Sequence, residues 1–154
     1  MFSLIITVIA IALVAALALA TIYYGGSAFN KGSASAKAAQ LIMEGQQISG
    51  AWQMLQAESA LSGSGSNVID MAALVSQKYL TQIPEAYVNG FVDNGVLRDG
   101  EFITLDICNE LERRAGRHGF TASSAPPSAA VLAKDLPGKF GCYKGENYGA
   151  YYKL

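Results

Sequence analysis

The chain has 154 residues, with 11 Lys and Arg against 12 Asp and Glu and a hydrophobic share of 51%. This length is typical of one domain with an appended segment. All charged residues lie beyond residue 30, where positive and negative charges nearly cancel. No basic surface is therefore expected that could neutralise phosphates, which argues against nucleic-acid contact, and the apolar beginning of the chain indicates a membrane instead.

Residues 1–24 contain no charge, no proline and no glycine. As a helix they would span about 34 Å, which is enough to cross the hydrocarbon core of a bilayer. A cleavable secretory signal has a basic start and a shorter apolar stretch, of about 7–15 residues, so we expect a retained helix. The run ends in Tyr23 and Tyr24, which is typical of the headgroup layer or of stacking between packed subunits.

The apolar run has no basic residue before it, and the first one after it is Lys31. An uncleaved anchor whose N-terminal end stays in the cytoplasm normally carries positively charged residues on that side. Two explanations stay open. Either a short basic leader has been removed and Met1 is the first residue of the mature chain, or Met1 is the initiator and the topology is set in another way.

Residues 25–34 predict a flexible break that contains glycine and serine, and Gly25 and Gly26 mark the point where the helix would end. From residue 35 to 61 apolar residues recur at steps of three and four, which predicts an amphipathic helix. Its apolar stripe is expected to pack on the head of the chain. The stripe includes Leu41, Ile48, Trp52 and Leu55.

Residues 62–154 predict a globular head. The segment SGSGSN at 62–67 is interpreted as a linker, because it lacks the lysine of a phosphate-binding loop. A short helix is expected from about Ile69 to Tyr79, with Pro84 as its stop.

Residues 86–106 alternate apolar and polar side chains around two turn signals, Asp93–Gly95 and Arg98–Gly100. This pattern predicts a three-stranded antiparallel meander. Asp106 is then expected to cap a helix that ends at Gly116. One or two tyrosine-rich strands follow near the end of the chain, so the predicted fold class is α+β, a long helix with a small antiparallel sheet.

The two cysteines, Cys108 and Cys142, have neither the spacing of a CxxC redox motif nor enough companions for a metal site. An even pair in a chain with an export segment predicts a disulfide formed outside the cytoplasm. Two unpaired, buried thiols are the alternative.

No convincing catalytic group emerges. His118 is the single histidine and lies just past a predicted helix end, which favours a surface position. A cysteine nucleophile would need this histidine as its base. Asp106, Glu110 and Glu112 are interpreted as solvated helix charges. We therefore expect a protein that is not an enzyme and that has no metal site and no cofactor.

The combination of an apolar N-terminal helix, an amphipathic continuation, an antiparallel sheet and a late cysteine resembles a type IV pilin. MFSLIITVIAIALVAALAL resembles the mature pilin start, and LVSQKYLTQIP is similar to a segment that many pilin-like proteins carry after the long helix. LDICNELERR, with Cys108 on a helix and Cys142 near the end, is similar to the type IVb branch. That branch also tolerates a methionine as its first mature residue, which would account for Met1.

The resemblance implies a structural subunit whose long helix packs on a small sheet with a C-terminal disulfide loop. Such a subunit is processed by a prepilin peptidase, is N-methylated at its first residue (here Met1) and lies in the inner membrane before assembly. Assembly machinery with an ATPase then builds identical subunits into a helical pilus outside the bacterial cell. Adhesion, conjugation, DNA uptake, motility and secretion all use such filaments. The residues implied for filament-core packing are Phe2, Leu4, Ile5, Ile9, Leu13 and Leu17.

One feature departs from the family. Ile5 and Ile6 occupy the region where a glutamate is expected, and the first carboxylate of the chain is Glu44. In the family this glutamate is thought to neutralise the N-terminal amine of a neighbour. Near the start only Ser3 and Thr7 have polar side chains. The departure favours a minor pilin or pseudopilin, at a filament tip or in a secretion system. A single-span protein with a periplasmic binding domain is a further alternative.

Overall fold

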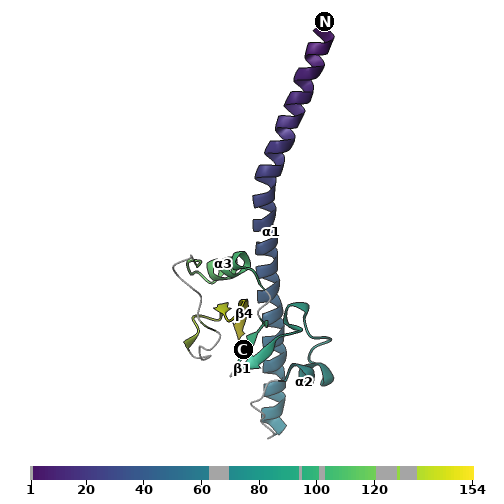
Figure 1. The fold of residues 1–154 in the computed structure, drawn as a ribbon. Coiled ribbons are helices and arrows are strands. Elements are labelled where there is room, and N and C mark those ends of the chain that lie inside the picture. Colours follow the sequence, from purple (N-terminus) through teal and green to yellow (C-terminus); the bar gives the residue numbers. More distant parts are fainter. Residues whose placement is uncertain (1, 63–69, 94, 101–102, 121–127, 129–134) are drawn as a thin grey trace. The chain divides into compact units, whose positions relative to one another are not determined.

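The computed structural model describes residues 2–62, 70–93, 95–100, 103–120, 128 and 135–154. The chain divides into two compact units, Met1–Ala34 and Ser35–Leu154. In chain order the elements are α1 (Phe2–Ser62), α2 (Met71–Ser76), the 3-10 turn η1 (Glu85–Tyr87), β1 (Phe91–Asp93), β2 (Val96–Arg98), α3 (Leu105–Arg114), β3 (Phe140–Lys144) and β4 (Tyr148–Lys153) (Figure 1). The long apolar N-terminal helix and the small antiparallel sheet of the predicted fold class are present.

α1 is a single helix that runs through residues 25–34, where we expected a break. A glycine weakens a helix by about 1 kcal/mol relative to alanine, but it keeps the backbone N–H that the helix needs. No proline occurs in this stretch. Gly25 and Gly26 therefore lower the stability of the helix without ending it. The two units meet at Ser35, where the amphipathic periodicity begins.

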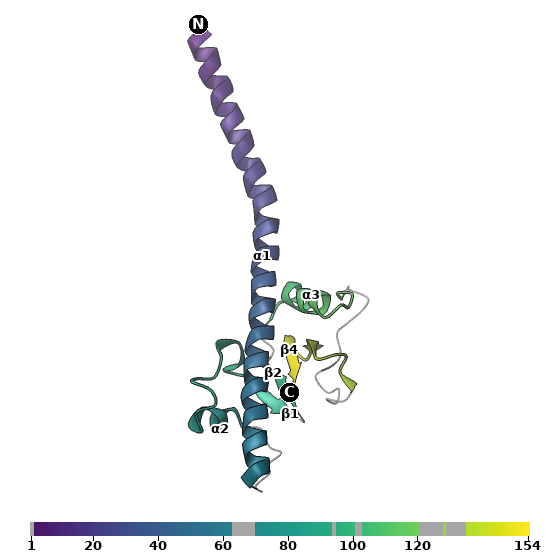
Figure 2. The ribbon, with the colours of Figure 1, turned by 180° about the vertical axis from the view of Figure 1, so that it is seen from behind.

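The second part of α1 buries one face in the core of the head. Leu41, Ile48 and Trp52 belong to the core cluster, and Leu55 packs against it. The same cluster contains Leu97, Ala150 and Tyr152 of the sheet together with both cysteines. In both ribbon views α2 and α3 lie on opposite sides of this part of α1 (Figures 1 and 2).

The sheet has four antiparallel strands in the order β1-β2-β4-β3. β1 and β2 form the predicted hairpin, and Gly95 has a φ of 78° at its turn. The third strand of the expected meander is wrong, since Ile103 forms only an isolated bridge with Tyr148. The place beside β2 is taken by β4, which pairs with β2 through three of its six residues and with β3 through five.

The two faces of the sheet have different covers. Along β4, Ala150 and Tyr152 belong to the cluster that contains α1, whereas Tyr151 belongs to a second cluster. That second cluster also contains Val96, Tyr143 and Leu136. The alternation of neighbouring residues between two clusters is the period of two that a strand dictates.

The short helix α2 begins and ends inside the predicted limits. The Asp70 side chain accepts a hydrogen bond from the N–H of Ala72 at 2.9 Å and so fixes the start of the helix. The helix ends at Ser76, and the chain then turns through Lys78, whose φ is 66°. Pro84 is therefore not its stop. Residues 63–67 of the expected linker lie outside the described residues.

The N-cap of α3 is Thr104, not Asp106 as the sequence suggested. The Thr104 hydroxyl accepts from the N–H of Ile107, and Asp106 lies in the first turn, where its negative charge suits the positive end of the helix dipole. The predicted end is confirmed, because Gly116 adopts a φ of 73° just after the helix.

Two glycines of α1 give a matched test of the packing between α1 and β4. A Cβ added at Gly45 would lie 2.8 Å from ring carbons of Tyr152, whereas one at Gly50 would meet nothing within 4 Å. Gly45→Ala should lower the free energy of unfolding of the head by about 1–3 kcal/mol through overpacking. Gly50→Ala should raise it by about 0.5–1 kcal/mol. Denaturant unfolding of the full chain in detergent micelles measures both, and equal effects would contradict the contact.

Candidate functional site

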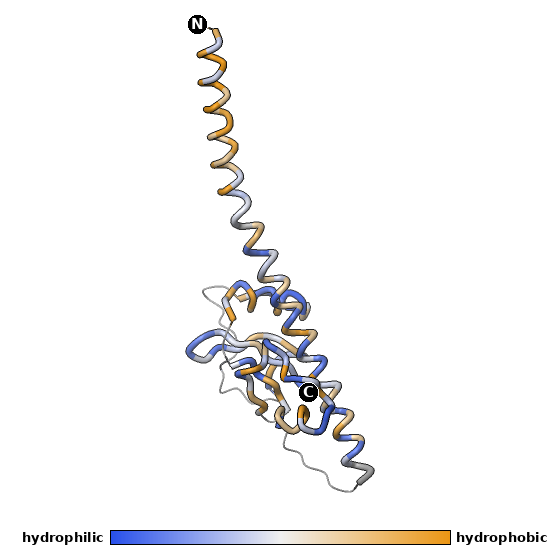
Figure 3. Tube along the Cα trace, turned by 90° about the vertical axis from the view of Figure 1, so that its right-hand side faces the viewer, coloured by the Kyte–Doolittle hydropathy of each residue, from blue (hydrophilic) through white to orange (hydrophobic). Residues whose placement is uncertain are grey.

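The first unit presents an apolar surface without a cover. The large apolar side chains of Phe2 through Ile22 are exposed, with exposed fractions from 54% for Ile9 to 84% for Phe2. Figure 3 shows apolar residues along the whole of this stretch. By length and composition the described residues hold one helix able to cross a membrane, and a signal sequence passes the same test. An apolar surface of this extent needs lipid or other protein around it.

The residues predicted for filament-core packing all belong to this exposed surface, and the isolated chain brings none of them together in a core. They are Phe2, Leu4, Ile5, Ile9, Leu13 and Leu17. Between the larger side chains lies a shallow apolar hollow lined by Ala10, Ile11, Val14, Ala15 and Ala18. Small side chains of this kind let another helix approach closely.

The two threonine hydroxyls of the first unit are hydrogen-bonded within the helix itself. The hydroxyl of Thr7 donates to the carbonyl of Leu4 at 2.8 Å, and that of Thr21 donates to the carbonyl of Ala18 at 2.8 Å. Such internal bonds are what an apolar environment requires of hydroxyl groups. Near its end the apolar run exposes Tyr23 and Tyr24, whose rings meet edge to face at 5.5 Å.

The predicted disulfide is confirmed. Cys108 on α3 and Cys142 on β3 are bonded, with 5.4 Å between their Cα atoms, and both are fully buried. No described cysteine is free. This excludes the alternative of two unpaired thiols, and with it a cysteine nucleophile activated by His118, which is exposed after the end of α3.

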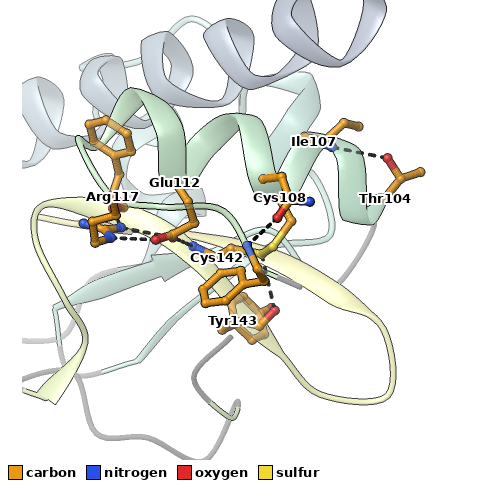
Figure 4. The surroundings of a disulfide bond; sticks show 10 residues. Thr104, Ile107, Cys108, Glu112, Arg117, Cys142 and Tyr143 are labelled. Atoms are coloured by element: carbon orange, nitrogen blue, oxygen red, sulfur yellow. Dashed lines mark hydrogen bonds and ion pairs between the residues drawn. A yellow bond between two sulfur atoms is a disulfide. The ribbon is translucent and has the colours of Figure 1, made fainter. Parts of the chain in front are cut away.

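Glu112 is not the solvated helix charge that the sequence suggested. It is only 2% exposed, and its carboxylate forms an ion pair with Arg117 through Nε at 2.6 Å and Nη2 at 3.0 Å (Figure 4). The hydrogen bond to Glu112 raises the pKa of Arg117. Glu112 is buried because it follows Cys108 by one helical turn and therefore shares the face of α3 that packs on β3. This spacing was the signal that sequence reasoning missed.

Glu110 is also more than a solvated charge, whereas Asp106 is exposed. The Glu110 carboxylate accepts from Arg113 at 2.6 and 2.8 Å, from Arg114 at 3.2 Å and from the hydroxyl of Ser35 at 3.1 Å. These contacts join α3 to the beginning of the second unit. The hydrogen bond from Arg113 leads the causes that lower the pKa of Glu110 to about 2.

The segment after α2 is fixed to α1 by polar bonds. The Glu44 carboxylate accepts from the N–H of Ala86 at 2.7 Å, and the buried hydroxyl of Tyr87 donates to the carbonyl of Leu41 at 3.1 Å. Burial raises the pKa of Tyr87. Before this segment, Leu74 belongs to the core cluster that contains Leu41 and Ile48 of α1.

A groove of about 1020 Å³ runs between this segment and α1. Its lining mixes small residues of α1, glutamines and the side chains of Met43 and Met54, which are 60% and 66% exposed. The groove adds exposed apolar surface to the head, outside its core. Among the residues that the structure describes, no group of three or more His, Cys, Asp or Glu could hold a metal ion.

Comparison of the chain with models of known families, with curated proteins and with solved structures yields no match.

The contacts of Glu110 predict a pH dependence of the head. Its pKa is lowered in the folded state, so its stabilising contribution is complete above the ordinary value near 4.5 and is lost as the pH falls towards 2. Glu110→Gln should therefore take up about one proton fewer on unfolding within this window. Unfolding midpoints between pH 7 and pH 2 measure the effect, with the exposed Asp106→Asn as control. Parallel profiles of wild type and Glu110→Gln would contradict the contact network.

Proposed function

We propose that this chain is a pilin-like structural subunit that polymerises through its apolar helix into a type IV filament, of the IVb kind, on a bacterial cell surface. The observation that carries the proposal is the exposure of large apolar side chains along residues 2–22. The same helix continues as the amphipathic support of a disulfide-bonded α+β head. In this proposal the architecture is the type IV pilin fold, and the protein acts by assembly, without catalysis.

The proposed mechanism exchanges one apolar environment for another. Before assembly the helix lies in the inner membrane, and in the filament it lies among the helices of identical subunits. Lipid tails are as apolar as leucine, so hydrophobicity does not favour the exchange, and the gain must come from close helix packing. The alanine-lined hollow at Ala10, Ala15 and Ala18 supports such packing.

The partners follow from this mechanism. A prepilin peptidase would expose and methylate Met1, and an ATPase-driven machine would extract the subunit from the membrane. Gly25 and Gly26 are adjacent glycines and each lowers the stability of α1, so we expect the helix to stretch or melt there as subunits reach their register.

A minor pilin or pseudopilin is the second candidate, and the first residues of the chain favour it. No carboxylate occurs before Glu44. An N-terminal ammonium group buried without a countercharge is costly. The nearby Thr7 hydroxyl, which donates to the Leu4 carbonyl, has lone pairs that can accept from an ammonium group but no charge to cancel it. A subunit at a filament tip avoids burying this amine between two neighbours.

Shearing of cells that express the chain tests the proposal directly. We expect filaments in electron micrographs, with this chain as their main component and N-methylated Met1 by N-terminal sequencing and mass. Filaments that hold only traces of the chain would assign it to a minor subunit. A membrane fraction that holds all of the chain as a monomer, with free or formylated Met1, would leave a single-span anchor with a small head and overturn the proposal.

Ala15→Leu separates filament packing from membrane anchoring. The substitution keeps the segment apolar, so insertion into the membrane should be unchanged. It fills the hollow beside Val14 and Ala18, and overpacking of about 1–3 kcal/mol should reduce subunit addition by about tenfold or more. The measurement is the ratio of sheared filament to membrane-bound chain. Leu17→Met, which conserves volume, is the control, and an unchanged ratio for Ala15→Leu would contradict helix packing at this hollow.

A further inference from the structure

Cys142 is held by α3 at two points that are one helical turn apart. Its sulfur is bonded to Cys108, and its backbone N–H donates to Oε1 of Glu112 at 2.9 Å (Figure 4). Residues four apart lie on one face of a helix, so the carboxylate and the sulfur both come from the face of α3 that packs on β3. The covalent link and the polar link therefore converge on one residue.

The polar link lies on an edge of the sheet. β3 is the last strand in the order β1-β2-β4-β3, and among the described residues its outer edge pairs with Ser128 through an isolated bridge at Lys144. The N–H of Cys142 and the carbonyl of Phe140 both bind to the ion pair, since Nη2 of Arg117 donates to Phe140 at 2.7 Å. Arg117 and Glu112 thus offer one donor and one acceptor to β3, as a neighbouring strand would.

The ion pair is tightly enclosed. A Cβ added at Gly141 would lie 2.6 Å from Oε1 of Glu112 and 2.7 Å from the hydroxyl of Tyr151. Gly141 therefore leaves the space that the ion pair occupies over the strand. Both oxygens of the Glu112 carboxylate are hydrogen-bonded, Oε2 to Arg117 and Oε1 to Arg117 and Cys142. A buried carboxylate with this many donors is stable only when its partners keep their places.

None of these polar contacts involves a sulfur atom. We propose that Glu112, locked by Arg117, is a positioning residue for formation of the Cys108–Cys142 disulfide, because it holds β3 on α3 in the dithiol form. The head then folds first and is oxidised second. The two thiols then meet because the ion pair already holds the backbone of Cys142 against α3, one helical turn along that helix from the thiol of Cys108.

The oxidation is a pair of thiol–disulfide exchanges with a disulfide donor, such as oxidised glutathione. The thiolate of one cysteine attacks the donor, forms a mixed disulfide and releases one thiolate. The thiolate of the second cysteine attacks the mixed disulfide and releases the other. Two protein thiols are oxidised, one donor disulfide is reduced to two thiols, and two protons pass to solvent or to the released thiolates. The ion pair takes no part in bond making and acts by raising the effective concentration of one thiol near the other.

Amide exchange of the wild-type chain tests the first half of the proposal. The full-length protein in detergent micelles is reduced without denaturant, and deuterium uptake of a peptide covering residues 140–144 is measured by mass spectrometry. We expect its exchange to stay at least about tenfold slower than in denatured chain. Exchange at the denatured rate after reduction would show that the disulfide alone holds the strand, and would overturn the proposal.

The second half is tested by equilibrium with glutathione. For Glu112→Gln the ratio of oxidised to reduced protein, at a fixed ratio of oxidised to reduced glutathione, should fall about tenfold or more. Asp106→Asn on the same helix is the matched control and should leave the ratio unchanged. Arg117→Lys keeps the charge but loses the fork of donors, so it should give an intermediate shift.

A purely structural role gives a different result. It would weaken the oxidised and reduced forms equally, so the glutathione equilibrium would stay at the wild-type value while the oxidised protein unfolds earlier. That outcome would overturn the positioning role. If Glu112→Gln fails to fold when reduced, Arg117→Lys supplies the variant for the glutathione measurement, and an unchanged equilibrium for it would overturn the positioning role.

Discussion

The head depends on the contact between α1 and β4, in which the absence of a side chain at Gly45 admits the ring of Tyr152. β4 is one of the two inner strands of the sheet, and it joins the hairpin of β1 and β2 to β3. β3 in turn carries Cys142 and with it the attachment of α3. A displaced β4 would therefore disturb every other element of the sheet, since interiors packed at this density transmit strain from one contact to the next.

Short-range sequence patterns correctly predicted the features that short-range interactions determine. The three-and-four periodicity of α1 and the glycine after α3 gave elements close to those observed, as did the hairpin turn at Gly95, and the count of cysteines gave the disulfide. Pairing of β2 with β4 was not predictable in this way, because the two strands are far apart in sequence and a nearer candidate at Ile103 competed for the same place. The continuity of α1 through Gly25 and Gly26 was missed because two glycines count as a break in a pattern, although they cost a long helix only about 1 kcal/mol each.

The two candidate sites also differ in how far the sequence predicts them. The exposed apolar surface of the first unit follows from composition, since a helix that is apolar on all sides has no face for water. The burial of Glu112 could not be read from composition, because its neighbours Glu110 and Asp106 differ from it only in the direction in which each leaves α3. Which side of α3 is buried can be predicted only when the element that packs on it is known. The disulfide to Cys142 identifies β3 as that element. The predicted disulfide could thus have indicated that Glu112, four residues after Cys108, is buried against β3.

The two proposals together separate what each part of the chain contributes. An apolar helix drawn from lipid into a filament gains its stability from neighbours, whereas the head must be stable before any neighbour arrives. The core of this head is modest, and a disulfide is the usual supplement to a small core outside the cytoplasm. A disulfide forms correctly only if β3 is in place first. In our proposal the ion pair of Glu112 and Arg117, enclosed over Gly141, holds β3 in place before the cysteines are oxidised. If the chain is a filament subunit, as proposed, its head would be finished before assembly, and we expect extraction from the membrane to strain α1 and to leave the sheet intact.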